Sequence, residues 1–342
     1  MAFMKPATAY VSAAILCVLV AALWLYRAGL NEGMPSEQTT TGNAFPGGRL
    51  PADGDVGTRR ERQHEKRKAA TSDRSLIARA RATAIQGILD GNADLIRQAI
   101  AMTPNDPYLL YLGATHSLLT PAEHLELSRR FHEQDPQNAL AAFIHAAHLL
   151  KTGDSAAALA ILRSSGDRPD CSDYINETWR LMEAAQIRAG HSSVEAKWMA
   201  FSKLEGGYYI DFRDTVGSLV QMAGDLPADE AASMRSLASY MSRRISDETK
   251  SGSIISQSVG LVMEKSVLEG MADDQPSPYD GMTVAEARKS IEAQRKQLME
   301  LTKYVPDYEQ LLRDSPQVLE IYLERSMRDG EVEALKWLRD KR

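Results

Sequence analysis

Apolar residues recur at helical spacing along most of the chain, and short polar turns separate the apolar segments. Over residues 138–150, Ala142, His145, Ala146 and Leu149 lie on one face of a predicted helix. Thr152-Gly153-Asp154 ends that helix, since glycine suits the left-handed end of a helix, and a second helix is predicted from residue 155. The pattern therefore indicates helix pairs joined by short turns.

Two of the polar turns share one pattern. Thr103-Pro104-Asn105-Asp106 and Asp135-Pro136-Gln137-Asn138 each precede an apolar helical segment, and their prolines lie 32 positions apart. Repetition at that period is typical of stacked helix-turn-helix arrays. Such an array presents surfaces for binding and does not by itself imply chemistry.

The second unit resembles the tetratricopeptide repeat (TPR). It has a small residue in mid-helix at Ala146, a glycine near the turn at Gly153, an alanine in the second helix at Ala158, and a large apolar residue at Leu162. The closing proline of the motif is absent. The resemblance implies an α-solenoid of paired helices whose inner helices line a concave groove.

Two other segments match the motif less completely. The preceding unit begins at Pro107 and has the small residues Gly113 and Ala114, but Glu126 stands where an alanine is expected. A third unit is predicted over residues 173–204. We therefore assign TPR-like helical repeats to residues 72–205.

Residues 206–342 form a second helical region without the proline-containing turns. Helices are predicted over 208–222, 227–245 and 254–271. Thr283 and Glu286 have the spacing of a capping box, Ser315-Pro316 opens a helix, and Asp329-Gly330 divides a final hairpin. No alternating strand pattern occurs after the linker, so the predicted fold class is all-α.

The N-terminus predicts a membrane anchor. After a short tail over residues 1–6, an uncharged run of 20 residues extends from Ala7 to Tyr26, which is the length needed to cross a bilayer as a helix. Trp24 and Tyr26 suit a membrane interface. We assign a single transmembrane helix to residues 7–28 and expect the helical body outside the cytoplasm, in the periplasm of a bacterium. The alternative is a cleaved signal peptide, which would need a shorter apolar core and a small-residue cleavage site.

Residues 29–71 are predicted to be a disordered linker. Residues 31–57 are rich in Gly, Pro, Thr and Asp and have no periodicity. Residues 59–68 hold six basic and two acidic side chains. This run is interpreted either as a contact with anionic lipid headgroups or as a solvated tether end or frayed helix.

The charge and the cysteine content argue against a nucleic-acid-binding protein and against a disulfide-rich protein. From residue 73 onward the chain holds 31 Lys and Arg against 40 Asp and Glu, a net charge of −9. So acidic a body predicts no binding to nucleic acid. The two cysteines, Cys17 and Cys171, lie in different regions and form no disulfide framework.

The resemblance places candidate binding residues on the inner helices. Carried onto this sequence, the groove positions are Tyr108, Tyr111, Thr115, Phe143, Ala147 and Lys151. Aromatic side chains with a lysine would hold an extended peptide, so the predicted partner is a protein or peptide. The alternative interpretation is that the aromatic residues cement neighbouring helices.

Few residues are candidates for catalysis or metal binding. His124, His132, His145 and His148 lie on two consecutive predicted helices, but no HExxH sequence or nearby cysteine joins them, so no metal or other cofactor is predicted. No phosphate-binding loop, dinucleotide-binding motif or nucleophile elbow is present. No catalytic residue is therefore assigned.

The leading hypothesis is a membrane-anchored helical-repeat protein, not an enzyme. It would act as a protein–protein interaction scaffold or a chaperone-like helper at a bacterial envelope. The alternative is an all-helical enzyme or enzyme subunit with a site near the four histidines. A third alternative, a structural spacer, differs from the first only in lacking a partner.

Overall fold

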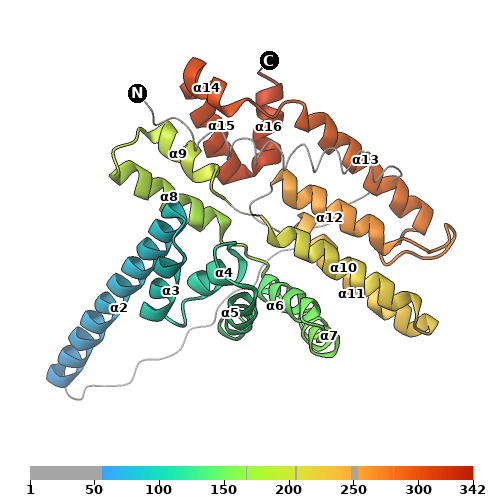
Figure 1. Cartoon of the computed structure of the whole chain (residues 1–342), viewed down its shortest axis with the longest axis horizontal. Coiled ribbons are helices and arrows are strands. Elements are labelled where there is room, and N and C mark those ends of the chain that lie inside the picture. The colour runs from blue at the N-terminus through green and yellow to red at the C-terminus, as the bar shows by residue number, and fades with distance from the viewer. Residues whose placement is uncertain (1–55, 167, 205, 248–252, 280, 342) are drawn as a thin grey trace.

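The computed structural model describes residues 56–341 except 167, 205, 248–252 and 280 (Figure 1). Within these residues the chain forms 15 helices. They are α2 (Val56–Asp90), α3 (Ala93–Met102), α4 (Pro107–Thr115), α5 (Pro121–Gln134), α6 (Ala139–Lys151), α7 (Ser155–Ser164), α8 (Ile175–Arg188), α9 (Ser193–Phe201), α10 (Tyr208–Gly224), α11 (Ala228–Asp247), α12 (Ile254–Val267), α13 (Val284–Thr302), α14 (Tyr308–Asp314), α15 (Pro316–Asp329) and α16 (Glu331–Arg339). The prediction of an all-α fold is confirmed for the described part of the chain.

Helices that follow one another in the sequence pack as pairs. The pairs α2–α3, α4–α5, α6–α7 and α8–α9 are in contact, as are α11–α12 and α15–α16. The polar turns provide the caps that start these helices: the side chains of Asp106 and Asn138 accept hydrogen bonds from the backbone N–H groups of Tyr108 and Leu140. This arrangement of adjacent pairs is consistent with a helical repeat.

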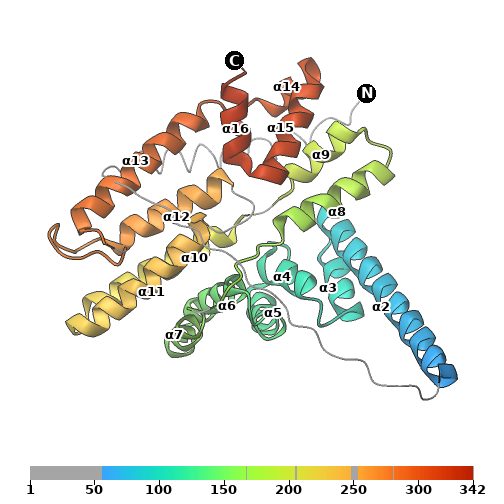
Figure 2. The ribbon, with the colours of Figure 1, turned by 180° about the vertical axis from the view of Figure 1, so that it is seen from behind.

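The order in space departs from a single row of stacked pairs. Helix α8 packs against α2, at the start of the described chain, and α6 packs against α10. Helix α9, in turn, packs against α14 and α15 near the C-terminus. Figure 1 and Figure 2 show this return, with α8 lying across the end of α2 while α7 lies on the other side of the helices between them. The predicted third unit therefore exists as a helix pair but joins the other end of the array.

Arg81 stabilises the return of α8 onto α2. Its guanidinium Nε and Nη2 bind the two carboxylate oxygens of Asp106 at 2.7 and 2.8 Å, and its Nη1 binds Glu177 on α8. The guanidinium carbon also lies 4.9 Å from the ring centre of Tyr108. The bidentate pair joins α2 to the start of α4, where the Asp106 side chain is only 3% exposed, and the more exposed Glu177 adds the link to α8.

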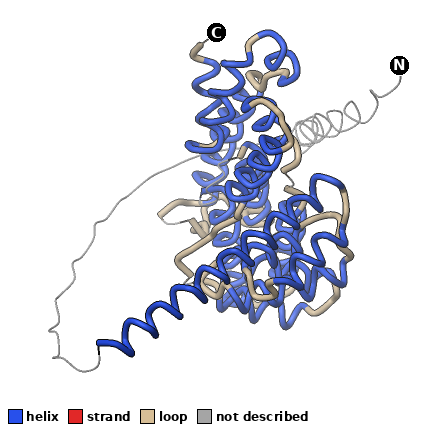
Figure 3. The backbone as a smooth tube through the Cα atoms, turned by 90° about the vertical axis from the view of Figure 1, so that its left-hand side faces the viewer, coloured by secondary structure: helices blue, strands red, loops and turns tan. Residues whose placement is uncertain are grey.

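The structure describes the N-terminal region only from residue 56 onward. Helix α2 begins at Val56, so the structure has a helix over 56–71, where a linker was predicted. Arg, Glu, Gln, Lys and Ala are good helix formers, and a helix nucleated by the packed part of α2 extends through them. Figure 3 shows these first turns projecting from the other helices. Residues 1–55, with the predicted anchor over 7–28 and the rest of the linker, lie outside the described residues. Among the helices that are described, none is both long enough and apolar enough to cross a membrane.

Candidate functional site

The predicted groove residues lie mainly in the interior. Tyr108 and Phe143 are fully buried, and Tyr111 and Ala147 are each 3% exposed. Thr115 is partly buried and its hydroxyl donates to the backbone carbonyl of Tyr111. Lys151 is exposed, and its ammonium lies 2.5 Å from the Asp211 carboxylate on α10.

Aromatic rings from other helices cover these positions. The ring of Tyr111 lies 5.9 Å from Phe131 of α5, 5.4 Å from Tyr174 and 6.2 Å from Tyr208 of α10. Phe143 lies 6.3 Å from Phe212 of α10 and 6.0 Å from Tyr240 of α11. We call this set the aromatic junction; it consists of Tyr108, Tyr111, Phe131, Phe143, Tyr174, Tyr208, Phe212 and Tyr240.

Tyr174 brings the segment before α8 into the junction. Its φ angle is 51°, the one positive φ of a non-glycine residue in the described chain, and a tyrosine there needs compensating contacts. Its hydroxyl donates to Asp135 at 2.9 Å. Its ring contacts both Tyr108 and Tyr111. With this backbone conformation, the ring of Tyr174 lies against Tyr108 and Tyr111 of α4.

The junction has the character of a core. Burial raises the pKa values of Tyr111 and Tyr208 well above their ordinary value, so both phenols stay neutral. In this arrangement the aromatic groove residues contact neighbouring helices, as the alternative interpretation of the sequence describes. Peptide binding by the six predicted residues stays a prediction.

The four histidines lie along the contact between α5 and α6. The rings of His124 and His148 are 5.5 Å apart, and the rings of His132 and His145 are 6.0 Å apart and stacked. Each pair has one member on each helix. We call the four residues the histidine ladder.

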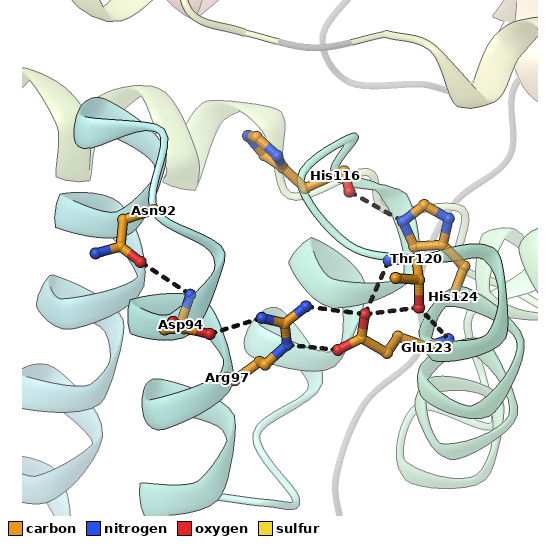
Figure 4. Close-up of polar contacts among 7 residues, drawn as sticks. All are labelled: Asn92, Asp94, Arg97, His116, Thr120, Glu123 and His124. Carbon is orange, nitrogen blue, oxygen red and sulfur yellow. Dashed lines mark hydrogen bonds and ion pairs between the residues drawn. The ribbon is translucent and has the colours of Figure 1, made fainter.

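Hydrogen bonds orient each ring of the ladder. Nε2 of His124 lies 2.9 Å from the backbone carbonyl of His116, and Nε2 of His148 lies 3.0 Å from that of Ala114. Since a carbonyl only accepts, both nitrogens carry a proton and donate. Figure 4 shows His124 reaching the His116 carbonyl, while the His116 imidazole points away.

The start of α5, which positions His124, is held by a capping box. The Glu123 carboxylate accepts from the backbone N–H of Thr120 at 2.8 Å and from Arg97 of α3 at 2.6 Å (Figure 4). These hydrogen bonds lower the pKa of Glu123 to about 2. The beginning of the ladder is therefore anchored to α3.

The second pair of the ladder has a polar neighbour on each side. The His145 Nδ1 lies 3.1 Å from Oγ of Ser128, and the His132 Nδ1 lies 3.1 Å from the Arg168 guanidinium. Burial is the main cause that lowers the pKa of His145 to about 4 and also lowers the pKa of His132 and His148. The buried part of the ladder is neutral at pH 7.

No metal site is formed by this ladder or elsewhere in the described residues. The described chain contains no group of three or more His, Cys, Asp or Glu side chains with metal-binding geometry. Cys171 is buried, which raises its thiol pKa to about 12 and makes the thiolate scarce at neutral pH. An enzymatic role for the four histidines stays a hypothesis.

A groove that the sequence reasoning did not assign lies between α12, α13 and α16. Its volume is about 940 Å³. Its apolar lining includes Leu261, Leu298, Leu301 and Val332, which are each at most 9% exposed. Tyr304 also lines the groove, together with Gln257, Gln294 and Gln297.

Basic side chains predominate among the charged residues of the groove. Lys296, Lys336 and Arg339 line it, against the single carboxylate of Glu300. Glu300 binds Lys303 at 2.6 Å, Lys336 binds Glu333 at 2.6 Å and Arg339 binds Asp340 at 2.8 Å. All three are exposed surface pairs, which contribute little to stability and leave these side chains able to contact a partner. The spacing of Gln294, Gln297, Leu298 and Leu301 on one helix is the sequence signal that could have indicated this groove.

Comparisons with protein families, with curated protein sequences and with solved structures find no match to this chain.

Proposed function

We propose that this protein is a membrane-anchored helical-repeat protein that binds a polypeptide partner and performs no catalysis. In this proposal, residues 7–28 hold it in the membrane as a single-pass protein. The helical body lies outside the cytoplasm at a bacterial envelope, where it acts as a scaffold or chaperone-like helper. The chain is TPR-like in this proposal because Ala146, Ala158 and Leu162 are fully buried and Gly153 has a φ of 87° at the turn between α6 and α7.

The groove is chosen as the binding surface because of one difference between it and the aromatic junction. The groove between α12, α13 and α16 is open, while the aromatic junction is filled by side chains of the protein itself. The apolar lining would take apolar side chains of a partner, and the glutamine amides would bond to its backbone. The three basic residues against one carboxylate favour an acidic partner. We therefore propose that the groove binds an acidic polypeptide segment that also carries apolar side chains.

The test uses full-length protein solubilised in detergent. A fluorescein-labelled decapeptide of leucine and glutamate is titrated with protein, and binding is read from fluorescence anisotropy. The matched peptide has lysine in place of every glutamate. We expect saturable binding of the acidic peptide alone. Equal binding of the two peptides, or of neither, would contradict the proposal.

Two substitutions on the same helix localise the binding. Lys296→Glu changes the groove, whereas Lys289→Glu makes the same charge change at an exposed position of α13 outside the groove. We expect Lys296→Glu to weaken acidic-peptide binding by about tenfold, which corresponds to ~1.4 kcal/mol, and Lys289→Glu to leave it within about twofold of wild type. Equal losses in both variants would show a general charge effect. Anchoring is read separately: the full chain should sediment with membranes, and a chain lacking residues 1–28 should not.

A further inference from the structure

The contact between His132 and Arg168 constrains the protonation state of the histidine. Nδ1 and Nε2 of His132 lie 3.1 and 3.5 Å from two guanidinium nitrogens of Arg168. Arginine has only donors and stays protonated, so the imidazole must be neutral and accepts at one ring nitrogen, while the other ring nitrogen carries its proton. Adding a proton to His132 removes the hydrogen bond and leaves two cations facing each other.

Arg168 also connects α5 with α6, and we call the contact between these two helices the α5–α6 joint. Besides His132 on α5, its Nη1 lies 3.4 Å from the backbone carbonyl of Asn138, the residue that caps α6. The Asn138 side chain in turn accepts from the backbone N–H groups of Leu140 and Ser172. Breaking the His132–Arg168 contact therefore weakens the connection between the end of α5 and the start of α6.

His145 adds a second proton-sensitive position to the same pair. Ser128 donates its single hydroxyl proton to the backbone carbonyl of Leu125 at 2.8 Å. In the 3.1 Å hydrogen bond between Ser128 and His145, Nδ1 of His145 is therefore the donor and the Ser128 oxygen is the acceptor. A further proton would have to go to Nε2, on a ring that is 7% exposed and stacked on His132. Protonating either ring places a buried charge beside the other.

The charged groups around the ladder do not supply a spare carboxylate. On α5, Arg129 binds both Glu126 and Glu133, at 2.8 and 2.5 Å. On the side of α10, Asp211 binds Lys151. Behind Arg168, Asp135 accepts from Tyr174, and Arg244 of α11 donates to the Arg168 carbonyl at 2.6 Å. With Asp135 and Arg244 included, four carboxylates (Glu126, Glu133, Asp135 and Asp211) meet four cations (Arg129, Lys151, Arg168 and Arg244), so added protons give a net positive charge at the joint.

From this geometry we propose that the α5–α6 joint is a proton-sensitive switch. It is closed while His132 and His145 are neutral, and it loosens when these two histidines are protonated in mild acid. Loosening separates the two helices that carry Phe131 and Leu140, both fully buried in the closed joint. The proposal does not depend on the groove between α12, α13 and α16 or on its partner.

The direction of the pH effect follows from linkage. The pKa of His145 is about 4 in the folded protein and about 6.5 in an unfolded chain, so the unfolded chain binds more protons between these values. The stability of the joint is therefore complete above pH 6.5 and falls as the pH is lowered toward 4. Between pH 7.5 and pH 5.0 the equilibrium for opening should shift by about tenfold or more.

The experiment is hydrogen–deuterium exchange of the full-length protein at pH 7.5 and pH 5.0, with labelling times scaled for intrinsic exchange. We expect peptides from α5 and α6 to lose protection by about tenfold or more at pH 5.0, and peptides from α15 and α16 to keep theirs. The double variant His132→Gln/His145→Gln should lose most of this response. The control His191→Gln removes an exposed histidine outside the ladder and should respond like wild type.

Three results would overturn the proposal. They are an unchanged protection of α5 and α6 in wild type at pH 5.0, a full response in the double variant, or loss of the response in His191→Gln. Should the double variant be unprotected already at pH 7.5, Arg168→Gln decides the question. That variant removes the cation but keeps an amide donor, so its response should be smaller than that of wild type, and an undiminished response would refute the switch.

Discussion

The aromatic junction and the C-terminal groove are both places where helices distant in sequence converge, yet one is filled and the other is open. The inner faces of α4 and α6 carry Tyr111 and Phe143, which contact rings from the segment before α8, from α10 and from α11. The facing sides of α12 and α13 carry Gln257, Gln294 and Lys296, which keep solvent access. The chemical kind of the inward side chains, more than the curvature of the helix array, decides whether a hollow becomes core or groove.

The largest expected effect lies in the junction. Phe143→Ala removes a fully buried ring that contacts Phe212 and Tyr240. We expect it to lower the free energy of unfolding by about 3–5 kcal/mol, measured by urea denaturation followed by circular dichroism. A loss below about 1 kcal/mol would mean that this ring is not packed in the core in solution.

An intermediate effect is expected where α11 and α12 cross beneath the groove. A Cβ atom added at Gly260 would lie 2.8 Å from Cα and 2.9 Å from the backbone nitrogen of Ser246, which lines the groove. Gly260→Ala should therefore destabilise the protein by about 1–3 kcal/mol, because backbone must move.

The matched control for that substitution is Gly217→Ala in α10. A Cβ there would meet no atom within 4 Å, so the gain in helix propensity should stabilise the protein by up to about 1 kcal/mol. The melting temperatures of Gly260→Ala and Gly217→Ala, measured by thermal unfolding, compare the two substitutions. Equal shifts of the melting temperature would show that the close approach of Gly260 to Ser246 does not exist in solution.

The smallest effect on stability is expected at the rim of the groove. Lys296 is exposed, and Lys296→Glu should change the free energy of unfolding by no more than about 0.5 kcal/mol, although we expect it to weaken binding of the acidic peptide. Urea denaturation of this variant beside Phe143→Ala contrasts the two regions directly. A loss comparable to that of Phe143→Ala would place Lys296 in the structural framework.

Several helix ends were predictable from a capping residue, a proline or a glycine at the turn. Thr283 and Glu286 form the predicted capping box, and Pro316 is the first residue of α15. Gly330 separates α15 from α16 with a φ of 90°. Helix α14, with seven residues, was missed, because a segment of two turns is too short to show helical periodicity. These outcomes all depend on residues within a few positions of one another.

The candidate sites were less predictable, for the same reason. The resemblance to the tetratricopeptide repeat placed Tyr111 and Phe143 on inner helices, but it contained no information about the ring of Tyr208, 97 positions away from Tyr111. The histidines were visible as a cluster on neighbouring helices, whereas Arg168, which faces His132, lies 36 positions further along the chain.

Local sequence thus decided the helices, their caps and the polar turns, since those depend on backbone hydrogen bonds and conformational preferences over a few residues. Tertiary packing decided that α8 returns to α2, that the inner face of α4 and α6 is filled, and that α12, α13 and α16 leave an open groove. These outcomes depend on which apolar faces meet after the chain has folded back, and the hydrophobic effect that drives such contacts has no preferred direction or partner.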